Sequence, residues 1–447
     1  MTGKINVYVV GSGGREAMLG RICRESGLFG DIFVGPGNGG TSEFGTPAIV
    51  TPDFPRCKRF ISFLKEKSIG LVLSGSENDL VKDLGDIVRM HNIPFFGASS
   101  AAARFESSKI RATEFMHANN ISHPDHEIFD NASFEKNRAE AVAYAKNQFN
   151  AGVAGLVIKA DGLAGGKGVF LAHSYDQFVA DIDRLKGFGE AGGKFLVEQM
   201  LKGVEVSVTA IVGDDGSYRL LPFSQDYKRV GEGDTGDNTG GMGAVTVDLH
   251  SGIVDKLGRK VIIPTIDGAE RMGIPMRRCA VYFGIMFSGG EPYVLEYNMR
   301  FGDPETQAIG LKTKNLALLL LQCARGERWD KVELDNNHYA AIIHAARGYP
   351  GDYSKSEELP ITGIQEARGL ENVMVNIAGT KINDKKELVV KGSRNINVIG
   401  SGTTQALALE AARAGSGLIK SDGLFYRSDI GCNLGEIEAL NAKYGGS

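Results

Sequence analysis

The segment at residues 294–307, V-L-E-Y-N-M-R-F-G-D-P-E-T-Q, brings together side chains that can bind a metal ion and an anion. It begins as a strand-like apolar run. Because side chains alternate between the faces of a strand, Glu296, Asn298 and Arg300 share one face, each about 6–7 Å from the next. A carboxylate beside an amide oxygen suits Mg²⁺, which also keeps positions for substrate phosphates. Arg300 can hold a carboxylate or a phosphate through two parallel hydrogen bonds.

The other interpretation of this segment is an edge strand with a solvated polar face. The turn that follows at once, G-D-P-E at 302–305, is tight and acidic, and it favours a binding site over a solvated strand. The rest of the chain must therefore supply the elements that position this site.

The first hundred residues alternate strand and helix patterns, which is typical of a parallel sheet with right-handed crossovers. We expect strands at 5–10, 32–35, 71–74 and 93–97, and helices at 15–26, 56–67 and 80–91. Ligands of such sheets bind at the carboxyl ends of the strands. Three loops there have a composition suited to binding: G-S-G-G-R-E at 11–16, G-P-G-N-G-G-T at 35–41 and S-G-S-E-N-D at 74–79.

The first of these loops is close to the dinucleotide-binding fingerprint but does not match it. Gly11 and Gly13 fit, whereas Glu16 stands where close packing of helix on strand requires Gly or Ala. Glycines that open a helix can also bind a single phosphate through backbone N–H groups, and Arg15 would strengthen such a site. A ligand with one phosphate therefore fits this loop better than NAD.

A second unit begins after a predicted helix at 101–118 that carries Lys109. A strand at 155–160 contains Lys159, and the loop D-G-L-A-G-G-K-G at 161–168 leads into a return strand at 169–173. We interpret this hairpin as a flap over a triphosphate, in which backbone amides and lysines meet the phosphates. A mobile β-turn with solvated lysines is the alternative. The flap residues concerned are Gly165, Gly166, Lys167 and Gly168.

Two acidic residues favour the flap interpretation. Glu198 lies on an apolar strand at 195–201, and Glu205 follows on a strand at 204–212. Their carboxylates suit contacts to the edge of an adenine and to ribose hydroxyls. Without such a partner, an inward-facing Glu needs a cation, because a lone buried charge is costly.

The remaining pattern completes this unit and then changes. We expect a strand at 218–225, a long glycine-rich loop at 226–243, strands at 280–287 and 293–298, and helices near 131–146, 251–272 and 306–323. Loops of that length inside a compact domain are usually functional or disordered. Short strands at 338–345, 373–378 and 396–399 with a helix at 404–414 then indicate a separate α+β module. The predicted domains are 1–108, 109–326 with a small lid subdomain at about 124–197, and 327–447.

Composition excludes several classes of protein. A formal net charge of −4 without a basic tract gives no indication of nucleic-acid binding. No apolar run is long enough for a membrane helix, and the start of the chain resembles no signal peptide. The five cysteines are scattered, without metal-ligand spacing, so we expect reduced thiols in a cytoplasmic protein.

Beyond these local patterns, the chain resembles the glycinamide ribonucleotide synthetase family (phosphoribosylamine–glycine ligases) of the ATP-grasp superfamily. The resemblance runs from the first strand to Gly431. The segments that carry it are G-S-G-G-R-E, P-G-N-G-G-T, E-S-S-K, V-I-K-A-D-G-L-A-G-G-K-G-V, S-Q-D-Y-K-R-V, G-D-T-G-D-N-T-G-G-M-G-A, E-Y-N-M-R-F-G-D-P-E-T-Q, R-G-Y-P-G-D-Y and Y-R-S-D-I-G.

The resemblance implies a fold and a reaction. The expected fold is a Rossmann-like α/β domain, a central ATP-grasp domain with its lid, and a C-terminal α+β domain. The expected reaction joins glycine to 5-phosphoribosylamine, with ATP and Mg²⁺ or Mn²⁺, through glycyl phosphate. The enzyme would act as a monomer or small homo-oligomer, without nucleic acid or membrane partners.

The resemblance also assigns roles to individual residues. Arg300 would clamp the glycine carboxylate, Asp226 would hold its ammonium group, and Gly240 and Gly241 would close beside them. Lys167 would join Lys109 and Lys159 on the phosphates. The sugar-phosphate amine would bind to Gly13, Gly14, Arg15, Asn38 and Glu77 in the first domain, while Glu296 and Asn298 would hold the metal.

Five positions depart from the family pattern, and they bear on the amine substrate rather than on ATP or metal. They are Ala17, Ser76, Ala98, Tyr227 and Asp237. Three other functions therefore stay open. They are another ATP-grasp ligase (a nucleotide carboxylase or a D-Ala-type ligase), an NAD-dependent oxidoreductase that uses the first loop, and an ATP-binding relative without catalytic activity.

Overall fold

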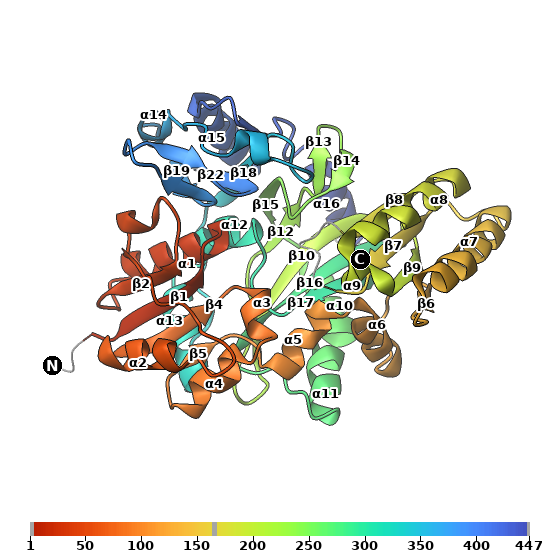
Figure 1. Cartoon of the computed structure of the whole chain (residues 1–447), viewed down its shortest axis with the longest axis horizontal. Helices are drawn as coiled ribbons and strands as arrows, with labels where there is room; N and C mark the ends of the chain where they lie inside the picture. The colour runs from red at the N-terminus through yellow and green to blue at the C-terminus, as the bar shows by residue number, and fades with distance from the viewer. Residues whose placement is uncertain (1–3, 163–167, 445–447) are drawn as a thin grey trace.

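The computed structural model describes residues 4–162 and 168–444. Its N-terminal part contains a five-stranded sheet in the order β3-β2-β1-β4-β5 (Figure 1). All neighbouring strands in it are parallel, as the sequence predicts. The strands are β1 (Asn6–Gly11), β2 (Ile32–Pro36), β3 (Thr46–Pro47), β4 (Ile69–Ser74) and β5 (Phe95–Phe96).

Two predicted helices of this region are each divided in two. The expected helix at 80–91 is α3 (Glu77–Leu80) and α4 (Leu84–Met90), because Asp83 has a left-handed φ of 67° that no α-helix includes. The expected helix at 101–118 is α5 (Ser100–Ser107) and α6 (Lys109–Ala118). Ser108 between them is extended, and its side chain caps α6 by accepting a hydrogen bond from Arg111 N. The other helices here are α1 (Gly14–Glu25), α2 (Lys58–Glu66) and the 3₁₀ turn η1 (Thr41–Glu43).

A small antiparallel sheet forms the region predicted as the lid, at the right of Figure 1. Its order is β6-β9-β7-β8, and its core contains the buried side chains of Phe129, Phe178 and Phe195. The strands are β6 (His126–Phe129), β7 (Leu156–Ala160), β8 (Val169–Ala172) and β9 (Phe195–Gln199). The helical segments are α7 (Phe134–Asn150), α8 (Tyr175–Arg184), η2 (Leu185–Phe188) and α9 (Glu190–Gly193).

One ten-stranded sheet runs through the centre of the molecule and into its C-terminal part. Its main path is β17-β16-β10-β12-β15-β18-β22-β19, with β11 beside β10 and β23 beside β18. The C-terminal strands therefore extend the central sheet through the pair β15–β18. The strands are β10 (Val204–Val212), β11 (Tyr218–Leu220), β12 (Phe223–Asp226), β15 (Gly243–Val247), β16 (Cys279–Ser288), β17 (Glu291–Asn298), β18 (His338–Ala346), β19 (Val373–Ile377), β22 (Arg394–Gly402) and β23 (Leu424–Phe425).

Helices complete these two regions. The predicted helix at 251–272 is present with a π-helical turn in its middle, and the predicted helix at 306–323 is interrupted between residues 312 and 316. The elements are α10 (Ser251–Leu257), η3 (Gly258–Ile262), α11 (Ile263–Arg271), α12 (Glu305–Lys312), α13 (Leu316–Arg325), η4 (Ser354–Ser356), α14 (Ile364–Arg368), α15 (Gln405–Leu418) and α16 (Leu434–Ala442). Between β19 and β22 in the sequence, β20 (Thr380–Ile382) and β21 (Leu388–Val390) form an antiparallel hairpin.

The expected long loop at 226–243 is wrong in part, because it contains a hairpin of β13 (Arg229–Gly231) and β14 (Thr235–Asn238). The hairpin is fixed by a residue almost two hundred positions away. Arg427 is 1% exposed, donates to Asp234 at 2.7 Å, and pairs with Asp429 at 2.8 Å. Its guanidinium also lies over the ring of Tyr227, one of the departures from the family pattern.

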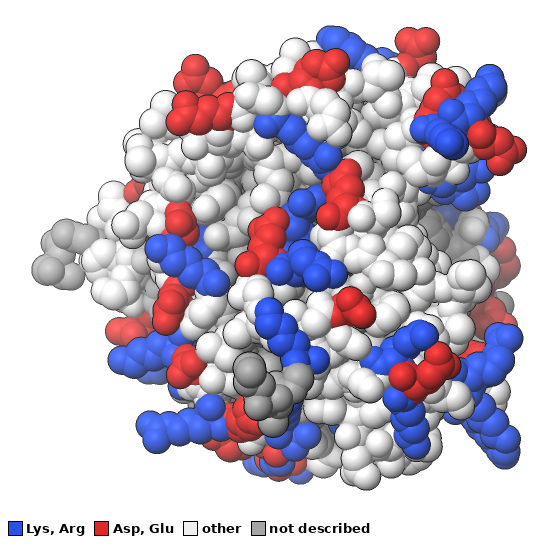
Figure 2. Space-filling model, turned by 90° about the vertical axis from the view of Figure 1, so that its left-hand side faces the viewer, with Lys and Arg blue, Asp and Glu red and all other residues white. Residues whose placement is uncertain are grey.

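The structure also shows how the charged side chains and the cysteines are distributed. On the face shown in Figure 2, basic and acidic side chains are intermingled. None of the helices in the described part of the chain is long and apolar enough to cross a membrane. The five cysteines are free thiols, and all but Cys432 are buried.

Candidate active site

A cavity of about 650 Å³ is lined by residues of the N-terminal part, the lid, the central sheet and the C-terminal part. Most of the site residues predicted from the sequence contribute to its wall. They are Arg15, Glu77, Lys109, Lys159, Gly168, Glu198, Glu205, Asp226, Gly240, Glu296, Asn298 and Arg300. Gly165, Gly166 and Lys167 lie outside the described residues.

The predicted metal ligands lie on β17, the edge strand of the central sheet. A bulge changes the alternation there, since Val294 pairs with Ile285 while Glu296 pairs with the adjacent Gly284. Leu295 and Glu296 therefore both line the cavity, together with Asn298. Arg300 lies beyond the end of the strand but reaches the same wall.

Glu296 stays ionised in this cavity although it is partly buried, with 30% of its side chain exposed. Burial by itself would raise the pKa of its carboxyl, but Lys228, Lys109 and Lys159 outweigh burial and lower that pKa to about 2. The nearest cation is Lys228, whose Nζ lies 3.4 Å from Glu296 Oε1 and also pairs with Glu205. The wall thus offers a permanent negative charge within a group of lysines.

Two lysines predicted to bind phosphate come from helix α6 and from strand β7. Lys109 opens α6, and burial lowers the pKa of its ammonium group although Glu296 opposes that shift. Lys159 on β7 pairs with Glu198 Oε2 at 2.5 Å and donates to Leu295 O at 2.8 Å. These contacts connect the lid to β17. Glu198 thus has the cationic partner that a buried carboxylate requires.

Arg300 lies between two carboxylates. Its Nη2 atom is 2.8 Å from Glu106 Oε1, and its Nε atom is 3.6 Å from Glu77 Oε2. Burial would lower the pKa of this guanidinium, but Glu106 and Glu77 raise it, so the charge is retained. Arg15 Nη2 lies 3.8 Å from Glu77, which connects the N-terminal loop to the same group.

Asp226 ends β12 with an oxygen that has no partner. Its Oδ1 atom is buried and accepts no hydrogen bond from the described residues. Burial and the neighbouring Glu305 raise the pKa of this carboxyl well above its usual range. Gly241 lies against it with a φ of 107°, and a Cβ there would be 2.8 Å from Asp226 Oδ1 and 2.3 Å from Pro304. A cationic ligand group at this wall would offset the cost of the unpaired carboxylate.

The loop after β1 is arranged differently from a dinucleotide site. Glu16 Oε2 accepts a hydrogen bond from Gly13 N at 2.8 Å, and a Cβ at Gly11 would lie 2.5 Å from Glu16 Cγ. The Glu16 side chain therefore occupies the space beside Gly11 and Gly13. A dinucleotide-binding loop has Gly or Ala at the position of Glu16. Of the predicted amine-binding residues, Gly13, Gly14 and Asn38 do not line the cavity, and Gly241 is also absent from the wall.

Several wall residues were missed by reasoning from the sequence. Lys228 stands in the segment S-Q-D-Y-K-R, and Asp303 and Glu305 belong to the acidic turn, so a local signal existed for these three. Glu106 opens the segment E-S-S-K and had a comparable signal, whereas Arg394 had none. They are brought to the cavity only by the packing of α5 and by the pairing of β22 in the sheet.

Comparison with known families agrees with this architecture. The model for the phosphoribosylglycinamide synthetase ATP-grasp (A) domain matches residues 107–306. The N-domain and C-domain models of the same enzyme match residues 5–106 and 339–433. An ATP-grasp domain binds ATP, and the cavity wall contains residues of all three matched regions.

Individual proteins are similar over almost the whole chain. The phosphoribosylamine–glycine ligase of Pasteurella multocida is 35% identical over 98% of this chain and 100% of its own length. That of Yersinia pestis is 37% identical, over 96% of this chain and 98% of its own. A bifunctional purine biosynthetic protein of Schizosaccharomyces pombe is 34% identical over 95% of this chain, which spans 53% of that protein.

Solved structures give the same result. The phosphoribosylamine–glycine ligase of Thermotoga maritima superposes with a TM-score of 0.78 at 29% identity, covering 95% of this chain and 100% of that one. A biotin carboxylase of Campylobacter jejuni, with a TM-score of 0.67 at 13% identity, shares the fold over 98% of this chain and 95% of its own. With three matching domain models and full-length relatives, the chain belongs to the phosphoribosylglycinamide synthetase (phosphoribosylamine–glycine ligase) family of ATP-grasp proteins.

Proposed function

We propose that this chain is an ATP-dependent carbon–nitrogen ligase that joins glycine to 5-phosphoribosylamine in purine biosynthesis. The products are glycinamide ribonucleotide, ADP and phosphate. Full-length similarity to phosphoribosylamine–glycine ligases supports this function. The observation that carries it is one cavity lined by several lysines, by Arg300 and by Asp226, whose Oδ1 atom accepts no hydrogen bond from the described residues. A cytoplasmic setting and a monomer or small homo-oligomer belong to the same proposal.

The chemistry proceeds in two steps. A glycine carboxylate oxygen attacks the γ-phosphorus of ATP, which forms glycyl phosphate and releases ADP. The amine of phosphoribosylamine then attacks the glycyl carbonyl carbon, phosphate leaves with the carboxylate oxygen, and the nitrogen loses a proton. Phosphoryl transfer of this kind requires mainly positioning and neutralisation of charge, which Lys109, Lys159 and Lys228 supply.

The amino acid binds by its two ends in this proposal. Arg300 retains its charge and faces the cavity, so it can clamp the carboxylate in a bidentate manner. Asp226 receives the ammonium group, whose positive charge favours the ionised carboxylate. Gly240 and Gly241 close beside them. The lid then excludes water, which protects an acyl phosphate from hydrolysis.

The wall also fits a divalent cation. Glu296 is ionised, and Asn298 offers an amide oxygen on the same strand. The described residues contain no group of three acidic, histidine or cysteine side chains that could enclose a metal. Mg²⁺ or Mn²⁺ at a triphosphate site usually takes one or two protein oxygens and keeps its other coordination positions for phosphates and water. Two protein oxygens at this wall match that preference. When bound, such an ion would neutralise charge on the transferring phosphoryl group.

The test is ADP release by the purified chain with freshly prepared phosphoribosylamine. We expect turnover only when ATP, glycine and Mg²⁺ are all present, with formation of one glycinamide ribonucleotide per ADP. Scoring a panel of other acids and amines separates this function from that of another ATP-grasp ligase. Nucleotide binding without any turnover would contradict the proposal and favour a relative without catalytic activity.

A further inference from the structure

A continuous chain of hydrogen-bonded side chains leads from the N-terminal loop into the C-terminal part of the molecule. Asn376 Nδ2 on β19 donates to the backbone oxygen of Gly14 and to Asn397 Oδ1 on β22, both at 2.9 Å. Gln307 Nε2 on α12 donates to the same Asn397 oxygen at 3.1 Å. The carbonyl of the first turn of α1 is thereby joined to the helix that follows the acidic turn.

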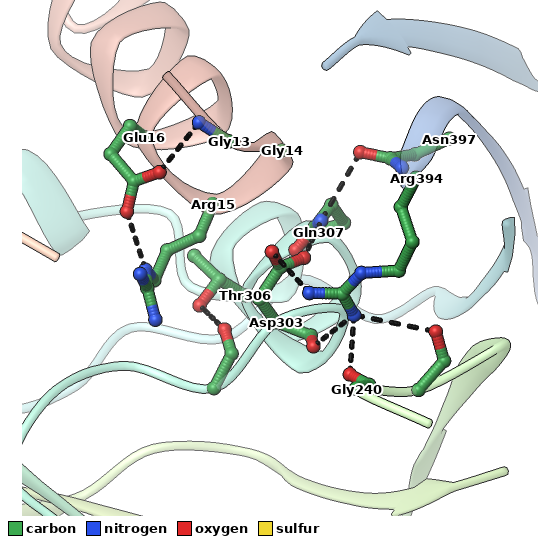
Figure 3. Close-up of polar contacts among 12 residues, drawn as sticks. Gly13, Gly14, Arg15, Glu16, Gly240, Asp303, Thr306, Gln307, Arg394 and Asn397 are labelled. Carbon is green, nitrogen blue, oxygen red and sulfur yellow. Dashed lines mark hydrogen bonds and ion pairs between the residues drawn. The ribbon is translucent and has the colours of Figure 1, made fainter. Parts of the chain in front are cut away.

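The chain continues from Gln307 to the segment that contains Gly240 and Gly241, which we call the glycine loop (Figure 3). Gln307 Nε2 also donates to Asp303 Oδ1 at 2.7 Å, and Arg394 Nη2 pairs with Asp303 Oδ2 at 2.9 Å. Arg394 Nη1 donates to the backbone oxygens of Asp303, Gly240 and Gly241. We call the side chains of Asn376, Asn397, Gln307, Asp303 and Arg394 the polar relay.

Stability alone does not explain the polar relay. Asn376 and Gln307 are 0% exposed and Asn397 is 1% exposed. Among the described residues, Gln307 Oε1 and Asn376 Oδ1 have no hydrogen-bond partner. A buried network that is only partly satisfied costs stability relative to an apolar core. Exceptions of this kind are expected where function requires a defined geometry.

The two ends of the polar relay identify what it positions. One end holds Gly14, which, like Arg15, is among the residues that the resemblance assigns to the amine substrate. The other end holds Gly240 and Gly241, and Gly241 lies against Asp226 at the amino-acid end of the cavity. Asp303 lies between them, and a Cβ at Gly13 would be 3.7 Å from its Oδ2 atom.

We propose that the polar relay positions the loop at residues 11–16, which contains Gly14 and Arg15, against the glycine loop. The amine then reaches the glycyl phosphate before water does. This inference rests on the proposed function and concerns its second step. Its members act through the two loops, so they are positioning residues. A misplacement of about 1 Å is enough to cost about 100-fold in rate.

The proposal predicts uncoupling rather than a uniform loss of activity. In the variant Asn397→Ala, both donors to the central oxygen lose their acceptor, while the lysines and Glu296 keep their places. Glycine-dependent ADP release should therefore persist, because glycyl phosphate still forms. Formation of glycinamide ribonucleotide per ADP should fall about tenfold, since the intermediate is hydrolysed when the amine is misplaced.

Asn395 provides a matched control on the same strand. It is also 0% exposed, but within the described part of the chain its amide bonds only to the backbone of Gly392 and Lys391, outside the polar relay. Asn395→Ala should reduce thermal stability as Asn397→Ala does, yet keep one product per ADP. Arg394→Lys keeps the positive charge but loses the guanidinium that donates to the backbone oxygens of Asp303, Gly240 and Gly241. This variant should uncouple the reaction without creating a buried cavity.

The ratio of product to ADP in these three variants decides the matter. Lower ratios in Asn397→Ala and Arg394→Lys, with Asn395→Ala at the wild-type ratio, support the polar relay. An unchanged ratio in the first two, or an equal loss in the Asn395 control, overturns it. If Asn397→Ala does not fold, the ratio of Arg394→Lys alone decides. Wild-type protein that makes no product would instead contradict the proposed function, so the two failures are distinguishable.

Discussion

The carboxylate of Glu296 lies among the ammonium groups of Lys228, Lys109 and Lys159. These cations keep its pKa near 2 against the effect of burial, so its charge is constant at any physiological pH. A cation that arrives with the nucleotide must share this carboxylate with Lys228, which already lies 3.4 Å from it.

At the scale of single residues we predict the effect of Glu296→Gln. The variant should keep its fold, because the side chain keeps its size, but turnover at limiting Mg²⁺ should fall about 100-fold or more, since metal ions contribute several kcal/mol of charge stabilisation. Glu291→Gln on the same strand is the control. That residue pairs with Lys256 and Lys260 on the outer side and should leave the rate unchanged. Wild-type rates for Glu296→Gln would show that the metal ligands lie elsewhere.

Among the elements, α6 has a special position because its first residue is Lys109. The helix starts there because Ser108 is extended and accepts a hydrogen bond from Arg111 N at 3.1 Å. Asp161 Oδ1 accepts a second bond, from Ile110 N. Both caps satisfy amides that have no partner within the helix. They fix the direction in which Lys109 leaves the chain.

We predict that Ser108→Ala destabilises α6 by about 1 kcal/mol, the usual cost of losing a serine cap. Hydrogen exchange at the amides of α6 should accelerate about fivefold, which is the same free energy expressed as a rate. Ser133 is the control, because it precedes α7 without accepting a cap hydrogen bond. Equal acceleration in α7 of Ser133→Ala would contradict the assigned role of the cap.

The same elements show what local sequence could and could not predict. The parallel N-terminal sheet was predictable because each strand and helix carries its own pattern. The division of 101–118 at Ser108 was missed, although a serine cap is a local signal. The hairpin within 226–243 was not predictable, because Arg427, which fixes it, comes from far along the chain.

On the scale of the whole molecule, the ten-stranded sheet explains why part of the site was missed. The predicted lysines and acids line one cavity because their motifs are local. Asn376 and Asn397 face each other only because β19 and β22 pair in that register, and Arg394 reaches the glycine loop only because β18 joins β22 to the central sheet. No local sequence pattern predicts which of these distant strands pair.

The central claim is that this assembly activates glycine by phosphorylating its carboxylate. The most direct measurement uses glycine labelled with ¹⁸O in both carboxylate oxygens, with ATP and phosphoribosylamine, followed by mass spectrometry of the released phosphate. Because the attacking oxygen leaves with phosphorus, we predict one ¹⁸O atom in each phosphate and one in the product amide. Phosphate without ¹⁸O would show that water, not glycine, attacks ATP, and would contradict the account.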